Sequence, residues 1–133
     1  MKIRSRGITL MELMVVLAVL AILVSIAFPT YFEQVRRTRR ADAMTVLTEL
    51  ANLQERRFTQ TFAYASVLGT GAGGLNHSGV SPDGYYNLSL VSSVPTSYTL
   101  TATANPPQDK DTGCTTLTLD STGAKAPATC WKR

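Results

Sequence analysis

The hydrophobic positions of the chain are concentrated near its N-terminal end. Between Ile8 and Phe28, 18 of 21 residues are hydrophobic, whereas the 105 residues from Pro29 onward contain 39. An α-helix rises about 1.5 Å per residue, so this run predicts a helix of about 31 Å, which matches a bilayer core of about 30 Å. A secretory signal peptide has a shorter apolar core, followed by a small-residue cleavage site. We therefore expect a retained membrane span.

Helical periodicity resumes after Pro29. Apolar residues recur at helical spacing between Ala43 and Leu53, with polar residues between them. Joined to the apolar run, this pattern predicts one helix over residues 8–58, about 75 Å long, whose first half (residues 8–28) is transmembrane. Pro29 lacks a backbone N–H and permits a kink. The second half of the helix is amphipathic and available to a globular head.

The remaining residues, 59–133, predict a long loop followed by a small antiparallel sheet. Glycine and other turn residues indicate a connection over residues 60–84. Alternating apolar and hydroxyl side chains predict strands at 85–91, 97–104 and 115–119, followed by a turn and a short fourth strand. Because one face is apolar and the other polar, the sheet should pack on the helix by one side. The expected fold class is α+β.

The composition gives little support for catalysis or for a bound cofactor. His77, the one histidine, lies in a Gly/Ser-rich loop without a nucleophile motif. Residues 109–113 match an acidic calcium loop only in part, because the third acidic position and the terminal glutamate are missing. Two distant cysteines and one histidine are too few for a metal site. We expect neither an enzyme nor a cofactor or metal.

Glu12 is the most informative single residue, because it places a carboxylate inside the apolar run. A charge at mid-bilayer costs about 2.5 to 3.5 kcal/mol, so an intramembrane acid is a functional candidate, although near one end it can also snorkel to the headgroups. A short basic leader, residues 1–7, ends in Gly7, and Glu12 is the fifth residue after it. This order of basic leader, glycine, glutamate and apolar run resembles the N-terminus of the type IV pilin family.

The resemblance implies a processing site and an assembly site. A prepilin peptidase would cleave between Gly7 and Ile8, and the new amino terminus on Ile8 would be N-methylated. Glu12, as the fifth residue of the mature chain, would register an incoming subunit against the charged terminus of a neighbour. Pairing with its own terminus across one helical turn is the alternative. The family usually has phenylalanine where Ile8 stands, and often glycine where Ala21 stands.

The resemblance also implies a disulfide between Cys114 and Cys130, which bracket a 15-residue segment. Closing such a loop contributes about 3 kcal/mol in the entropic model. A disulfide persists only in an oxidising compartment. The bond would therefore place the head in the periplasm and the leader in the cytoplasm, an orientation that the flanking Lys and Arg residues do not decide.

Two groups of basic residues are candidate contact sites. The four arginines between positions 36 and 40 admit three interpretations: a collar facing solvent or lipid headgroups, salt bridges to neighbouring subunits, or DNA contacts, in that order. Lys132 and Arg133, beside Trp131, are better exposed candidates for contacting a phosphate or a partner. Loss of the leader removes three basic residues from the formal charge of +4, which leaves ten basic and nine acidic side chains, or +1.

These features predict a structural subunit of a type IV pilus, specifically a minor pilin similar around residues 54–64 to small type IVa minor pilins. It would insert in the bacterial inner membrane and then join an extracellular pilus that serves pilus biogenesis, twitching motility, adhesion or DNA uptake. Its partners would be other pilin subunits, prepilin peptidase, the inner-membrane assembly machinery and membrane lipid, with DNA as a further candidate. The alternatives are a type II secretion pseudopilin and a membrane-tethered binding module that does not polymerise.

Overall fold

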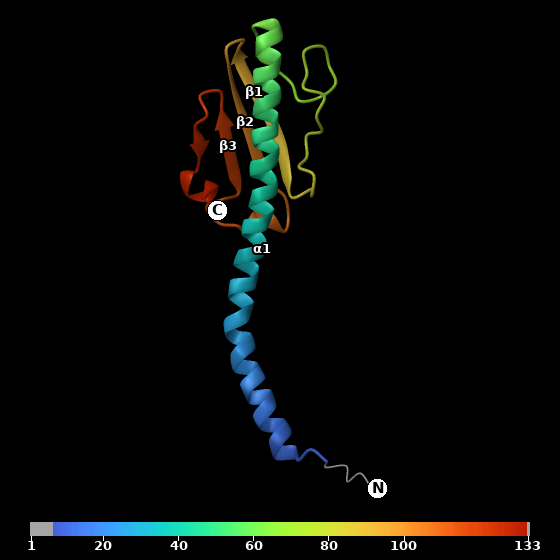
Figure 1. Ribbon diagram of the computed structural model, residues 1–133, viewed down its shortest axis with the longest axis vertical. Coiled ribbons are helices and arrows are strands. Elements are labelled where there is room, and N and C mark those ends of the chain that lie inside the picture. Colours follow the sequence, from blue (N-terminus) through green and yellow to red (C-terminus); the bar gives the residue numbers. More distant parts are fainter. Residues whose placement is uncertain (1–6, 133) are drawn as a thin grey trace, which may run out of the picture. The chain divides into compact units, whose positions relative to one another are not determined.

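The computed structural model describes residues 7–132, which form two compact units that meet between Val35 and Arg36. A single long helix, α1 (Leu10–Thr61), contributes its first half to one unit and its second half to the other. The second unit also holds a four-stranded sheet and two short 3-10 helices (Figure 1). Their bounds are β1 Tyr86–Val94, β2 Ser97–Ala104, η1 Gln108–Lys110, β3 Thr116–Asp120, β4 Lys125–Ala126 and η2 Ala128–Trp131.

The first half of α1 buries none of its apolar side chains within the chain. Its most apolar 18-residue window has a mean hydropathy of 2.8 and no buried residue, so the helix is long and apolar enough to cross a membrane. The Thr9 hydroxyl oxygen accepts a hydrogen bond from the backbone N–H of Glu12 at 3.2 Å and caps the first turn. The helix begins two residues later than the sequence predicts, and it continues through Pro29 without a break.

The second half of α1 packs one face onto the sheet and leaves the opposite face exposed. The buried residues recur at helical spacing, as the periodicity predicts: Ala43, Val46, Leu47, Leu50 and Gln54. Thr45 and Thr48, on the other face, are exposed. In Figure 1 this part of the helix lies across one face of the sheet. The hydrophobic core of the head is therefore a single layer between helix and sheet.

The sheet is antiparallel, with strand order β1–β2–β3–β4. The side chains that point toward α1 are mostly buried and apolar, whereas the side chains between them, which are threonines in β2 and β3, face away. The expected strand segments are confirmed, although β1 runs on to Val94 after a register shift that follows Val91. The α+β fold class is confirmed, with a long helix packed on one side of a small antiparallel sheet.

A buried glutamine fastens the loop after α1 to the helix. The Gln54 side chain is fully buried, its Nε2 donates to the carbonyl oxygen of Ala65 at 3.1 Å, and its Oε1 accepts from the Ala65 N–H at 2.7 Å. Phe62 adopts a left-handed backbone conformation with φ 55° and ends the helix. These two hydrogen bonds satisfy the backbone N–H and C=O of Ala65 beside the core. A hydrophobic side chain at position 54 could not make them.

Candidate functional site

The proposed processing and assembly residues lie at the start of α1. Gly7 and Ile8 precede the helix, Ile8 is 75% exposed, and, apart from the residues next to Gly7, no atom of the described residues lies within 4 Å of the position that a Cβ on Gly7 would occupy. The described residues therefore do not cover the peptide bond between them, and its cleavage remains a prediction. Glu12 is exposed in the first turn, where a carboxylate interacts favourably with the helix dipole. Residues 1–6 of the leader lie outside the described residues.

Glu12 is the one charged residue in the apolar run between Ile8 and Phe28. A carboxylate surrounded by apolar side chains is strongly favoured to pair with a cation once lipid or protein excludes water from it. Ile8 lies four positions earlier but precedes α1, so the helical spacing that would set its amino terminus against Glu12 of the same chain is not formed in the structure. Assembly through Glu12 remains a prediction.

A disulfide joins Cys114 and Cys130 and confirms the expected pairing; their Cα atoms are 5.7 Å apart. Cys130, in η2, is buried in the core, so the bond anchors the C-terminal segment against the sheet. Nη1 of Arg40 lies 3.3 Å from Sγ of Cys114 and brings α1 into contact with the same bond. The disulfide therefore holds Trp131, the residue after Cys130, in a defined place beside the helix.

A buried polar network ties η1 to α1. Nε of Arg40 lies 2.8 Å from Oδ2 of Asp111, and the two side chains are only 12% and 6% exposed. Nε2 of the fully buried Gln108 lies 3.0 Å from Oδ2 of Asp111 and 3.2 Å from both the Arg36 carbonyl oxygen and the Tyr86 hydroxyl. Burial raises the pKa of Tyr86 above its ordinary value, and the Asp111 carboxylate adds to that rise. The network joins three elements of the head.

The sequence-based view of this region needs correction at two places. Arg40 was expected to face outward or toward another molecule, but it pairs with Asp111 inside its own head. The guanidinium of Arg39 lies 4.3 Å from the centre of the Tyr85 ring, so it too has a partner in its own chain. Asp111, considered above as part of an incomplete calcium loop, serves as the partner of an arginine. Between residues 7 and 132 no group of three or more His, Cys, Asp or Glu side chains is arranged to hold a metal ion.

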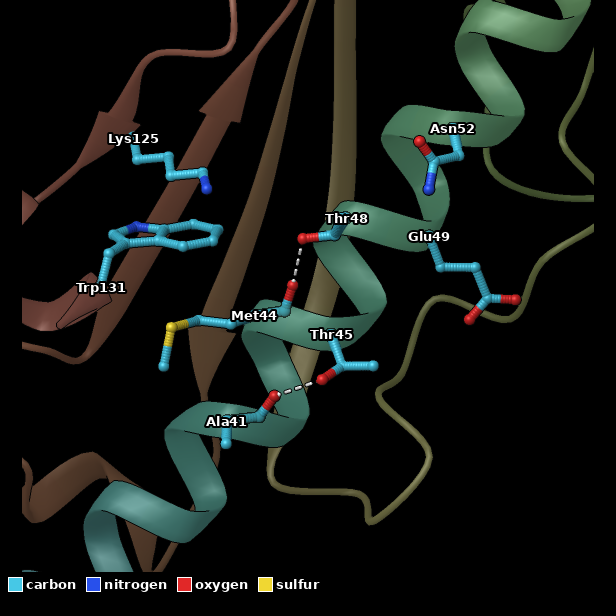
Figure 2. A pocket seen from close by; sticks show the side chains of 8 residues that line it. All are labelled: Ala41, Met44, Thr45, Thr48, Glu49, Asn52, Lys125 and Trp131. Atoms are coloured by element: carbon cyan, nitrogen blue, oxygen red, sulfur yellow. Dashed lines mark hydrogen bonds between the residues drawn. The ribbon is translucent and has the colours of Figure 1, made fainter. Parts of the chain in front are cut away.

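An open groove of about 560 Å³ runs between the exposed face of α1 and the edge formed by β4 and η2. We call it the Trp131 groove (Figure 2). The indole N–H of Trp131 donates to the carbonyl oxygen of Ala126 at 3.3 Å, and the Lys125 ammonium nitrogen lies 5.0 Å from the ring centre. Eight residues line the groove: Ala41, Met44, Thr45, Thr48, Glu49, Asn52, Lys125 and Trp131.

The turn between β3 and β4 places Lys125 at the rim of this groove. Oδ1 of Asp120 accepts hydrogen bonds from the Thr122 hydroxyl at 2.6 Å, the Thr122 N–H at 2.8 Å and the Ala124 N–H at 3.0 Å. These bonds, that of the Thr122 hydroxyl most of all, stabilise the ionised carboxylate and lower the pKa of Asp120. Gly123 supplies the left-handed conformation, with φ 82°, that the turn requires.

The structure describes two of the three predicted contact residues and adds one that the sequence did not suggest. Trp131 is half-buried in the groove and Lys132 is exposed, whereas Arg133 lies outside the described residues. Lys125 was not predicted, because its place beside Trp131 depends on the pairing of β3 with β4 and on the disulfide. The sequence signal that could have identified Lys125 was its place in the predicted C-terminal hairpin, shortly before the only tryptophan in the chain.

Comparison with known proteins covers both parts of the chain. Residues 2–28 match the model of the prokaryotic N-terminal methylation motif, and residues 29–118 match the model of the type IV minor pilin ComP, DNA uptake sequence receptor. No match was found among curated proteins.

Two of the solved structures that match this chain illustrate the shared fold. A type IV pilin from Shewanella oneidensis has a TM-score of 0.58 and 28% sequence identity, over 74% of this chain and 99% of that one. The Neisseria meningitidis non-core minor pilin PilV has a TM-score of 0.52 and 26% identity, over 70% of this chain and 86% of that one. The resemblance inferred from the leader is thereby confirmed. Because the family model spans more than half of its residues, the chain belongs to the ComP family of type IV minor pilins.

Proposed function

We propose that the chain is a minor pilin that loses its leader between Gly7 and Ile8, enters a type IV pilus through its N-terminal helix, and serves DNA uptake. The observation that carries the proposal is that a leader-motif match over residues 2–28 runs directly into a ComP match over residues 29–118. The exposed apolar helix and the disulfide-anchored head support a subunit whose helix packs with other pilin helices and whose head faces outward. The ComP match favours this role over a secretion pseudopilin.

The DNA contact is assigned to the C-terminal part of the head rather than to the arginine group at positions 36–40. Arg40 is bound to Asp111 and Arg39 lies over Tyr85, so both side chains have partners within the head. Lys125 and Lys132 are exposed, and either can neutralise a DNA phosphate without breaking an ion pair in the core. The proposed DNA role therefore rests on the family match together with exposed lysines on the C-terminal part of the head.

Processing is tested by the intact mass of the chain extracted from its membrane. We expect a mass that corresponds to loss of residues 1–7 and gain of one methyl group, located on Ile8 by fragmentation. A Gly7→Val variant, in which a branched side chain occupies the cleavage position, should keep the full-length mass. An uncleaved wild-type chain would contradict the pilin mechanism, because both the amino terminus and the proposed ion pair depend on cleavage.

The DNA role is tested in cells and with the purified full chain. Cells that lack the chain should take up less DNA and recover on re-expression, while the amount of sheared pilus fibre stays normal. The full chain in detergent micelles should bind DNA, with an affinity that falls as salt rises, because binding releases counterions from the phosphates. Unchanged uptake in cells without the chain would refute the DNA role and leave the membership of the minor pilin family intact.

A further inference from the structure

Folding of the head does not explain the exposed residues of the Trp131 groove. Thr45, Thr48 and Asn52 lie on the face of α1 that turns away from the core, and Lys125 is exposed on β4. The two threonine hydroxyls donate to helix carbonyls, that of Thr45 to Ala41 at 2.8 Å and that of Thr48 to Met44 at 2.7 Å. Their oxygens keep lone pairs that can accept hydrogen bonds from a ligand.

The groove joins three features that bind a nucleotide. Trp131 offers an aromatic ring, Lys125 offers a cation beside that ring, and the opposite wall is a helix face with both polar and apolar side chains. Figure 2 shows the indole projecting toward α1, with the Thr48 hydroxyl on the facing wall and the Glu49 carboxylate directed away from the ring. The volume of about 560 Å³ lies within the range of about 300 to 1,000 Å³ that small-ligand sites occupy.

We propose that this groove binds an unpaired nucleotide of DNA, with its base stacked on Trp131 and its phosphate on Lys125. The inference rests on the proposed role in DNA uptake and assigns the contact to one place on the head. An unpaired nucleotide is present in single strands and at frayed duplex ends, where the face of a base is free to stack on an aromatic side chain.

Binding of the nucleotide replaces the contact between Lys125 and Trp131 with two contacts, one from the base to Trp131 and one from the phosphate to Lys125. In the free head the Lys125 ammonium lies over the Trp131 ring at 5.0 Å. When a base arrives, the flexible lysine can leave the ring and contact the adjacent phosphate, while the base takes its place on the indole. Base stacking on an aromatic side chain is worth at least as much as an exposed cation–π contact, and the phosphate contact is gained in addition. Glu49 also lines the groove, and in Figure 2 its carboxylate is directed away from the Trp131 ring.

The rival occupant of the groove is a helix of another pilin subunit. The face of α1 that carries Ala41 and Thr45 is exposed, and these two side chains are small enough for a second helix to approach closely. A cation over an aromatic ring at the rim is better matched to a phosphate and a base than to the apolar run of a pilin helix. We therefore favour DNA, and the experiment separates the two.

The probe for the experiment is Trp131 itself, because it is the only tryptophan in the chain. The full chain in detergent micelles is titrated with single-stranded oligothymidine and, separately, with a blunt duplex of mixed sequence. Tryptophan emission is excited where the five tyrosines do not absorb. We expect saturable quenching by the single strand at a lower concentration than by the duplex, because the single strand offers its bases without unpairing.

Variants then test each contact by the anisotropy of a labelled oligothymidine. Trp131→Ala should weaken binding about 5- to 150-fold, the range found for one stacked base, and Trp131→Phe should keep most of the affinity. Lys125→Ala should lower the steepness of log K against log salt by about 0.7, the value for one lost phosphate contact on a single strand. Lys110→Ala, an exposed lysine in η1 outside the groove lining, should leave both quantities unchanged.

Three outcomes distinguish the nucleotide site in the groove, a subunit interface in the groove and the DNA role as a whole. If the wild-type chain binds DNA without quenching and both Trp131→Ala and Lys125→Ala bind as the wild type does, the groove assignment is wrong and the DNA role stands. If these variants keep their DNA affinity but are lost from sheared fibres, the groove is a subunit interface and the assignment is again wrong. If the wild-type chain binds neither oligonucleotide, the proposed DNA role fails and this inference fails with it. Lys125 is exposed, so its variant remains informative if Trp131→Ala does not fold.

Discussion

Replacing Asp111 by alanine is expected to lower the free energy of unfolding of the head by about 3 to 5 kcal/mol, the usual cost of removing one partner of a buried ion pair. The change leaves the Arg40 guanidinium, only 12% exposed, without its counter-ion at 2.8 Å. It also removes the acceptor that lies 3.0 Å from Nε2 of the buried Gln108. The measurement is chemical denaturation of the full chain in micelles, followed by Trp131 emission.

Asp109 provides the matched control, since it lies two residues earlier in η1 and is exposed. Asp109→Ala should change the stability by less than about 0.5 kcal/mol, as expected of an exposed surface substitution. The double variant Arg40→Met with Asp111→Leu should recover most of the loss, because apolar residues of similar size often replace a buried ion pair without penalty. Equal stability of Asp111→Ala and Asp109→Ala would show that the ion pair does not hold η1 to α1.

Glu12→Ala is expected to reduce entry into the pilus by about three orders of magnitude. A carboxylate and an ammonium 4 Å apart attract by about 4 kcal/mol at an effective dielectric of 20, and about 1.4 kcal/mol corresponds to a tenfold change. The variant also leaves the amino terminus on Ile8 without its partner in an apolar surrounding. The measurement is the ratio of the chain in sheared fibres to the chain in the membrane.

Two controls separate this effect from loss of insertion or processing. Glu12→Asp keeps the charge on a shorter side chain and should retain most of the incorporation. The intact mass of Glu12→Ala should still show loss of residues 1–7, and its amount in the membrane should match the wild type. Normal incorporation of Glu12→Ala would remove Glu12 from its proposed role while leaving the cleavage at Gly7 in place.

Local sequence patterns predicted most of the secondary structure, because each helix or strand depends largely on residues that are neighbours in the chain. The amphipathic spacing from Ala43 to Leu50 predicted the buried face of α1, and the alternation from Ser97 to Ala104 predicted β2 with its bounds. The end of α1 at Thr61 and the extension of β1 to Val94 were missed by three residues each. Such boundaries depend on contacts made after folding, here the hydrogen bond from the Tyr64 N–H to the Pro95 carbonyl oxygen at 2.8 Å.

Local sequence patterns did not predict contacts between residues far apart in the chain. Nothing in the cluster of arginines indicated that Arg40 pairs with Asp111, because the pairing requires α1 and η1 to lie side by side in the folded head. Likewise Lys125 and Trp131 meet only because β4 pairs with β3 and the disulfide holds η2 in place. An ion pair or a groove is a property of distances in space, which spacing along the sequence does not encode.

The sequence by itself determined the processing signal, the apolar helix and the one-sided sheet. Each of these depends on residues close together in the chain: a glycine before Ile8, a glutamate five residues after that glycine, a long apolar run and alternating strands. Only the tertiary structure decided what the polar residues of the head do. It brought Arg40 and Asp111 together largely out of water, where a low dielectric makes their pairing strong, and it left Lys125 exposed and Trp131 half-buried in a groove that water and a ligand can enter.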